Sequence, residues 1–190
     1  SGRCHRQHGS ATTGAADAVA DIESRIRRGE VGSISGGLDL ERLRRLQTIA
    51  VEESPHGIPL IFTLDVIHGY RTVFPLPLGL ACTWDAALVK RTARVAATEA
   101  AAAGIALAWA PMLDVSRDAR WGRCAESFGE DSLLGARLGV AMIEGYQQGD
   151  LTRADSVMAC AKHFAGYGFA EGGRDYNVAD ISSYRMHNEV

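Results

Sequence analysis

The sequence has few lysines, no long apolar run and no surplus of charge of one sign. Lysine occurs only at positions 90 and 162, so arginine carries nearly all of the positive charge. The 20 basic and 23 acidic residues give a net charge of −3, and no basic block occurs. This excludes the cluster of basic residues that a nucleic-acid-binding surface or a polybasic membrane-binding segment would have. The longest apolar run, 100–113, contains Gly104 and Pro111 and is shorter than the roughly 18 residues of a membrane span.

Metal-binding, disulfide and nucleotide-binding patterns are also missing. The four cysteines form no CxxC pair and show no metal-ligand spacing, which favours buried residues or free thiols over a disulfide framework. Neither GxGxxG nor GxxxxGK[ST] follows any apolar run, which disfavours the nucleotide-binding folds. The cysteines are Cys4, Cys82, Cys124 and Cys160.

The N-terminal residues lack the features of a secretory signal. Residues 1–10 have no apolar core, and the chain begins with Ser rather than Met, so we expect that a preceding segment has been removed. Residues 1–13 are polar and rich in Gly, Ser and Thr, which predicts a flexible N-terminal arm. No repeat or linker divides residues 14–190, which are therefore predicted to form one domain. The composition of the whole chain, 46% hydrophobic and 23% charged, is typical of a globular protein.

Apolar periodicity predicts alternating strands and helices. Short, continuously apolar segments are typical of strands that are buried on both faces of a parallel sheet. Longer segments with helical spacing separate them, and Asp85 and either Asp131 or Ser132 stand where helix caps are expected. Four successive β–α units fit an α/β fold, either a doubly wound sheet or part of a (β/α)8 barrel. The predicted strands are 31–35, 58–66, 105–112 and 156–164, and the predicted helices are 15–28, 38–51, 85–103, 131–149 and the segment from 182.

Polar residues gather where the predicted strands end. Asp65 follows the second strand, Asp114 the third, and Lys162 and His163 the fourth. Parallel α/β folds bind their ligands at the carboxyl ends of the strands, so we expect the functional site at this edge. Adjacent residues of a strand point to opposite sides, so Lys162 and His163 can face one ligand only where the strand ends or distorts.

Three long segments carry a more specific signal. The chain resembles the N-terminal barrel domain of glycoside hydrolase family 3, most closely its β-glucosidase branch, in LDVIHGYRTVFPLPLGLACTWD, APMLDVSRDARWGRCAESFGED and ACAKHFAGYGFAEGGRDYN. The resemblance covers residues 30–180 and implies the first part, about four β–α units, of a (β/α)8 TIM-type barrel. It also implies a retaining β-glucosidase acting on terminal, non-reducing β-D-glucosyl residues of β-linked glucosides or gluco-oligosaccharides, with no cofactor or metal and a periplasmic or secreted location.

The resemblance assigns four residues to the hydroxyls of a bound sugar, namely Asp65, Arg123, Lys162 and His163. On the residues alone, Asp65 could instead be a turn former, and Arg123 could merely pair with a nearby acid such as Glu126. A carboxylate can accept hydrogen bonds from two adjacent hydroxyls, and a guanidinium offers a fixed fork of donors. We therefore adopt the sugar-binding interpretation, with His163 as a hydrogen-bond partner rather than a proton carrier.

Other loop residues have interpretations of their own. Arg174 and Tyr176 either border the substrate entrance or belong to a solvated, charged flap. Trp121 is predicted to be the packing anchor of the long loop after the third strand, in which Arg117 and Asp118 are predicted to form a structural pairing. Structural roles are also predicted for His68, Arg71 and Asp114.

The catalytic carboxylates that the resemblance requires are not found in the chain. In the family, the nucleophile is an Asp in a Ser-Asp-Trp-like segment, and the acid/base Glu comes from a later domain, so both are expected beyond Val190. We therefore expect an N-terminal fragment that carries the sugar-binding residues and is inactive alone. Half of a parallel barrel has open strand edges, through which we expect copies of the chain to associate.

Alternative functions stay open at this point. A non-catalytic sugar-binding fragment belongs to a different class, and a β-xylosidase or a broad exo-β-glycosidase would use the same residues. The β-N-acetylglucosaminidase branch is disfavoured, because its KHFPGHG loop is KHFAGYG here, with Ala165 in place of Pro and Tyr167 in place of His.

Overall fold

The computed structural model describes residues 15–189, so the predicted flexible arm, residues 1–13, lies outside the described residues. The chain forms two compact units. The described part of the first unit consists of residues 15–32 and 41–60, and the second consists of 33–40 and 61–189. All of the residues assigned to the sugar lie in the second unit.

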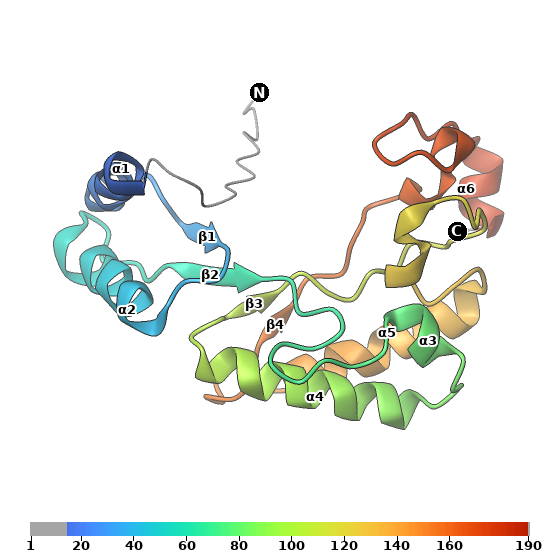
Figure 1. The fold of residues 1–190 in the computed structure, drawn as a ribbon, viewed down its shortest axis with the longest axis horizontal. Coiled ribbons are helices and arrows are strands. Elements are labelled where there is room, and N and C mark those ends of the chain that lie inside the picture. The colour runs from blue at the N-terminus through green and yellow to red at the C-terminus, as the bar shows by residue number, and fades with distance from the viewer. Residues whose placement is uncertain (1–14, 190) are drawn as a thin grey trace. The chain divides into compact units, whose positions relative to one another are not determined.

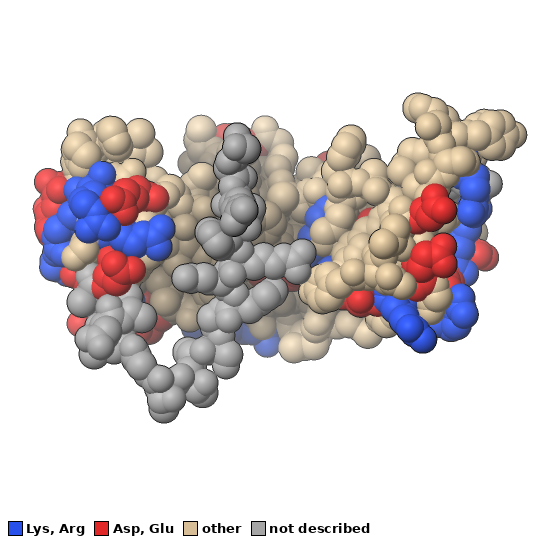
Figure 2. Space-filling view, turned by 90° about the horizontal axis from the view of Figure 1, so that it is seen from above, with Lys and Arg blue, Asp and Glu red and all other residues tan. Residues whose placement is uncertain are grey.

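The first unit consists of helices with an apolar core and a charged surface. Helix α1 spans Ala15–Arg27, and α2, Leu40–Thr48, continues into the π-helical turn Ile49–Glu53. Acidic and basic side chains alternate on its surface (Figure 2), where Glu23 accepts a hydrogen bond from Arg42 at 2.5 Å. Its buried apolar residues are Ile26, Leu43, Leu46, Ile49, Ala50 and Leu60.

The second unit is built on a parallel sheet, as the sequence predicts. Within the described residues the strand order is β1-β2-β3-β4, so each strand pairs with its neighbour in sequence (Figure 1). All three pairings are parallel. The regular strands lie inside the four predicted segments but are shorter. Their bounds are Ser33–Ser35, Ile61–Leu64, Leu107–Ala108 and Met158–Ala159.

Two long helices pack beside each other against the sheet (Figure 1). Helix α4 spans Ala86–Ala102 and α5 spans Ser132–Gln147. Their predicted caps are confirmed, because the Oδ1 atoms of Asp85 and Asp131 accept hydrogen bonds from the backbone N–H three residues later, at 2.9 and 2.7 Å. The second unit also contains the shorter helices α3, Pro77–Ala81, and α6, Ser183–Glu189.

Gly145 allows α4 and α5 to approach closely. A Cβ atom at this position would lie 2.5 Å from the backbone oxygen of Lys90 and 2.7 Å from the Cβ atom of Ala93. The next residue, Tyr146, is buried and donates its hydroxyl to the backbone oxygen of Val66 at 3.2 Å. Burial raises the pKa of the Tyr146 phenol, so the hydroxyl stays a donor. Helix α5 therefore holds the segment that follows β2.

The loops after β3 and β4 contain short 3-10 turns rather than open coil. They are η2, Gly122–Glu126, η3, Tyr167–Phe169, and η4, Glu171–Gly173. Cys82, Cys124 and Cys160 are free thiols, as expected, whereas Cys4 lies outside the described residues. Among the helices of residues 15–189, none is both long and apolar enough to cross a membrane.

Candidate functional site

The pairing of β3 and β4 continues past their regular ends and aligns the residues that follow. Met112 and Lys162 form an isolated parallel bridge, and the N–H of Leu113 donates to the backbone oxygen of Lys162 at 2.6 Å. Asp114 and His163, which follow these paired residues, therefore lie next to each other just beyond the ends of neighbouring strands. Asp65, directly after β2, lies at the same edge. The carboxyl ends of three strands thus meet where the sequence predicts a site.

Lys162 and Asp65 form an ion pair at this edge. The Nζ atom of Lys162 donates to Oδ2 of Asp65 at 2.5 Å, and only 12% of the lysine side chain is exposed, against 46% of the aspartate. Lys162 therefore does not extend into solvent, unlike most lysines. Asp65 also accepts from the N–H of Ile67 at 3.2 Å through Oδ1, which is the contact of a turn former.

His163 is held by an acid for which the sequence predicts only a structural role. Oδ2 of Asp114 lies 2.7 Å from Nδ1 of His163 and accepts from the backbone N–H of the same residue at 3.1 Å. The Asp114 side chain is 1% exposed, whereas that of His163 is 31% exposed. Asp114 thus belongs to the site. Its position directly after a strand, like that of Asp65, is the sequence signal that points to it.

Arg123 pairs with Glu126, as one of its two interpretations predicts. Its Nε atom donates to Oε2 of Glu126 at 2.5 Å, and Nη2 donates to Oε1 at 3.3 Å. Hydrogen bonding with Glu126 raises the pKa of the guanidinium, so Arg123 stays charged. Its third nitrogen, Nη1, lies 3.5 Å from Nε2 of His163. The structure therefore brings Arg123 to the same edge as Lys162 and His163.

Tyr167, in the loop after β4, packs against Trp121 and Arg123 of the loop after β3. Its ring stands at 89° to that of His163 and at 67° to that of Trp121, with centroids 4.8 and 5.2 Å away. The Arg123 guanidinium lies 5.4 Å from its centroid. Its hydroxyl donates to Oδ1 of Asp175 at 2.5 Å. This hydrogen bond lowers the pKa of Asp175, while burial raises that of Tyr167. Asp175 therefore accepts as a carboxylate.

Trp121 is fully buried, which confirms its prediction as the packing anchor of the loop. Its indole N–H donates to Oδ1 of Asp175 at 3.2 Å, so the loops after β3 and β4 share one acceptor. Within the first of these loops Asp118 forms a structural pairing, as predicted, and its partner is Arg120 at 2.7 Å. The Asp118 carboxylate also accepts from the backbone N–H of Arg120, which forms a turn that brings the Arg120 guanidinium close to it. Hydrogen bonds from Arg120 lower the pKa of Asp118 to about 2.

Arg174 and Tyr176 are exposed on either side of Asp175 in the chain, and Tyr176 has a positive φ of 62°. Asp175, between them, is also exposed but accepts hydrogen bonds from Tyr167 and Trp121. Their place at a substrate entrance stays a prediction.

The charge balance of the site suits a neutral, polyhydroxylated ligand. Lys162 is paired with Asp65 and Arg123 with Glu126, so neither cation is available as an uncompensated charge for an anion. The same groups offer alternating donors and acceptors. Within residues 15–189, no cluster of three or more His, Cys, Asp or Glu side chains is arranged to hold a metal ion.

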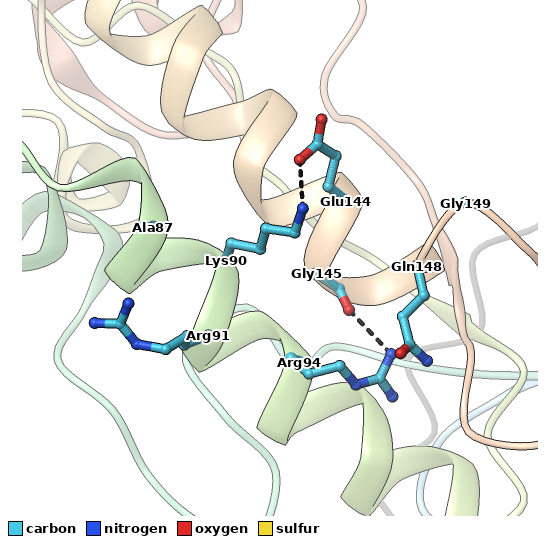
Figure 3. Close-up of a pocket in the computed structure, with 8 residues that line it drawn as sticks. All are labelled: Ala87, Lys90, Arg91, Arg94, Glu144, Gly145, Gln148 and Gly149. Carbon is cyan, nitrogen blue, oxygen red and sulfur yellow. Dashed lines mark hydrogen bonds and ion pairs between the residues drawn. The ribbon is translucent and has the colours of Figure 1, made fainter.

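Apart from the candidate site, a hollow lies between helices α4 and α5 (Figure 3). Its volume is about 700 Å³ and its polar side chains are engaged with one another: Lys90 with Glu144 at 2.8 Å, and Arg94 with the backbone oxygen of Gly145 at 3.1 Å. None of the residues that line it comes from the end of a strand. We therefore place the candidate site by its converging polar groups rather than by volume.

Comparison with known proteins gives consistent matches. The family model described as Glycosyl hydrolase family 3 N terminal domain matches residues 13–190. The chain is 45% identical to a periplasmic beta-glucosidase of Salmonella typhimurium, over 88% of the chain and 22% of that protein. It is 42% identical to a beta-xylosidase of Formosa agariphila, over 70% of the chain and 18% of that protein.

Solved structures agree with these matches. A beta-glucosidase from Listeria innocua in complex with glucose superimposes with a TM-score of 0.82 at 39% identity, over 93% of the chain and 26% of that structure. The chain therefore spans about a fifth to a quarter of the length of these relatives.

Proposed function

Since the chain belongs to glycosyl hydrolase family 3, we propose that it is the sugar-binding part of a retaining β-glucosidase. Its β–α units are the first part of the TIM-type barrel of that family, as the sequence predicts. The proposed enzyme removes terminal, non-reducing β-D-glucosyl residues from β-linked glucosides or gluco-oligosaccharides. The convergence of Asp65, Lys162, His163 and Arg123 at one sheet edge is the observation that carries the proposal.

Each of these residues has a distinct part in holding the sugar. Asp65 accepts hydrogen bonds from adjacent hydroxyls, and its 46% exposure leaves acceptor positions open beside Lys162. Lys162 and Arg123 donate to hydroxyl oxygens. A hydrogen bond to a charged group contributes about 1.5–3 kcal/mol, so a few of them suffice to orient one glucose unit. Arg174 and Tyr176 are proposed to border the entrance.

The two catalytic carboxyl groups are proposed to come from outside residues 1–190. Retaining hydrolysis needs a nucleophile and an acid/base whose carboxyl groups lie about 5–5.5 Å apart. The nearby acids are already engaged: Asp65 pairs with Lys162, Asp114 is buried against His163, and Asp175 accepts from Tyr167. Asp114 and Asp175 are thus held by other partners, and Asp65 is assigned to the sugar hydroxyls, which supports a nucleophile Asp and an acid/base Glu in later segments.

A β-xylosidase is the second candidate, and the 42% identity to a beta-xylosidase of Formosa agariphila favours it. Xylose lacks the hydroxymethyl group of glucose but presents the same ring hydroxyls. The residues assigned above therefore do not by themselves distinguish the two sugars. A broad exo-β-glycosidase and a non-catalytic sugar-binding protein are the other outcomes of the test.

The test measures sugar binding by calorimetric titration of the purified chain, and hydrolysis by a longer polypeptide that contains it. We expect glucose to bind the wild type, Asp65→Ala to abolish the heat of binding, and Asp150→Ala to leave it unchanged. Asp150 follows the C-terminal end of α5, away from the strand ends that carry the site. There its carboxylate accepts hydrogen bonds from Thr152. The longer polypeptide should cleave aryl β-glucosides faster than aryl β-xylosides. The reverse preference would establish the xylosidase, and binding without cleavage would leave only the sugar-binding function.

A further inference from the structure

We propose that Asp114 is a positioning residue: it holds His163 in the tautomer protonated on Nδ1. The single lone pair of Nε2, which faces Arg123, then accepts a hydrogen bond from a ligand hydroxyl that takes the place of the long contact with Arg123. The inference rests on the proposed function only for the nature of the ligand. The tautomer itself follows from the groups on either side of the imidazole ring.

The first argument concerns the Nδ1 side of the ring. A carboxylate has acceptors only, so the 2.7 Å contact between Oδ2 of Asp114 and Nδ1 of His163 requires a proton on Nδ1. The Asp114 side chain is 1% exposed, and burying a carboxylate is costly unless donors compensate it. The only donors to it among the described residues are the backbone N–H and Nδ1 of His163. Its environment therefore demands the Nδ1 proton.

The second argument concerns the opposite side of the ring and is independent of the first. Nε2 of His163 lies 3.5 Å from Nη1 of Arg123, and a guanidinium has donors only. A proton on Nε2 would therefore point at another donor and, in the imidazolium form, would place two positive charges together. A neutral ring with its lone pair on Nε2 avoids both penalties. Both neighbours thus select the same tautomer.

Further contacts fix the plane of the ring. The Tyr167 ring stands at 89° to the imidazole with a centroid distance of 4.8 Å, and Tyr167 is itself held by Asp175. Arg123 is held in turn by two hydrogen bonds to Glu126. The 31% exposure of the His163 side chain leaves part of it open to a ligand. A hydroxyl that donates to Nε2 can also accept from Arg123, whereas a group without a proton cannot make the first of these bonds.

The test reads the tautomer directly, without a sugar. In solid-state nitrogen-15 spectra of the histidine-labelled 190-residue chain, protonated and unprotonated ring nitrogens have well-separated shifts, and the method does not depend on the size of any assembly. Comparison with His163→Gln identifies the His163 signals. We expect a protonated Nδ1 and an unprotonated Nε2 in the wild type at neutral pH. An Nε2-protonated ring, or an imidazolium, would overturn the proposal.

Two variants separate positioning from mere packing. In Asp114→Asn, the amide oxygen can accept both hydrogen bonds, so the Nδ1 tautomer should persist and glucose affinity should stay within about threefold of the wild type. In Asp114→Ala, the tautomers should mix and glucose binding should weaken about tenfold, or about 1.4 kcal/mol. Asp150→Ala serves as the matched control.

The tautomer result and the sugar-binding result test different claims, so failure of the positioning role can be told from failure of the proposed function. An unchanged tautomer in Asp114→Ala contradicts the positioning role, whatever the sugar affinity. The predicted tautomer in a chain that binds no sugar leaves the positioning role intact and contradicts the proposed function instead. If Asp114→Ala does not fold, the wild type and Asp114→Asn decide: loss of the Nδ1 proton in the folded Asn variant overturns the proposal.

Discussion

Lys162 and Asp65 are 97 positions apart in the sequence, yet their Nζ and Oδ2 atoms lie 2.5 Å apart. This ion pair joins the ends of β4 and β2 across β3, which lies between them in the sheet. Neighbouring strands are about 4.8 Å apart, so the long Lys162 side chain reaches across the end of β3 to Asp65. The pair therefore marks the centre of the candidate site.

The ion pair predicts a selective effect of Asp65→Ala on function. In the proposed full-length enzyme, we expect kcat/KM for an aryl β-glucoside to fall about 10²-fold or more, because Asp65 contacts the sugar in the transition state. The melting temperature should hardly change, since the side chain is half-exposed. Steady-state kinetics and thermal unfolding check the two parts. A large loss of stability with retained turnover would show that Asp65 is only a turn former.

The order of strands and helices could be predicted from the sequence, because apolar periodicity and helix caps are local signals. All four predicted strands contain a regular strand, and Asp85 and Asp131 both cap helices. No element is predicted for the segment that forms the short helix α3, which has prolines at 75 and 77. Pro77 is nevertheless accommodated in the first turn of α3, where its missing N–H costs nothing.

The partners within the site could be predicted only in part. The positions of Asp65, Lys162 and His163 at strand ends follow from the fold class. The attachment of Asp114 to His163, and of Tyr167 to Asp175, depends on how two long loops fold against each other. No local pattern encodes that packing, so the contact of Asp114 with His163 is found only in the structure.

The Tyr167–Asp175 hydrogen bond predicts a pH-dependent contribution to stability. Because the bond lowers the pKa of Asp175 in the folded chain, its contribution is fully present above the unfolded value of about 3.9 and is lost as the pH falls through the lower folded pKa. Tyr167→Phe removes this hydrogen bond. We therefore expect it to lower the urea midpoint at about pH 5 and to lower it less at about pH 3.

Tyr184→Phe is the control for this experiment, because Tyr184 is exposed on α6. It should leave the urea midpoint unchanged at both pH values. A Tyr167→Phe variant whose deficit is the same at both values would mean that the hydroxyl stabilises the loop without favouring the ionised form of Asp175.

The close approach of α4 and α5 predicts opposite effects of two Gly-to-Ala changes in one helix. Gly145→Ala should destabilise the chain by about 1–3 kcal/mol, because the new methyl group meets the backbone of Lys90 (Figure 3). At Gly135, no described atom lies within 4 Å of an added Cβ, and Ala should stabilise α5 by about 0.5–1 kcal/mol. Urea denaturation of both variants measures the difference. Equal effects would contradict the tight helix contact.

The open edges of the sheet predict association of the chain. Strands β1 and β4 are the edges of the sheet in the described residues, and each has backbone groups that no neighbouring strand there pairs. We expect the purified chain to form oligomers whose mass rises with concentration, or to need a chaperone for solubility. Light scattering after size exclusion measures this. A monomer with one sharp, cooperative unfolding transition would show that the chain closes its own core.

The chain alone should not hydrolyse an aryl β-glucoside above background. Its polar groups are proposed to orient the sugar, but a carboxylate displaced by 1 Å from the attacking position can lose about 10²-fold in rate, and Asp114 and Asp175 are held by other partners. The measurement is turnover by highly purified chain, with Lys162→Ala as the control and a 2-fluoro glycoside as the mechanism-based label. Turnover that disappears in the control, with label on Asp114, Glu171 or Asp175, would show that the nucleophile lies within these 190 residues.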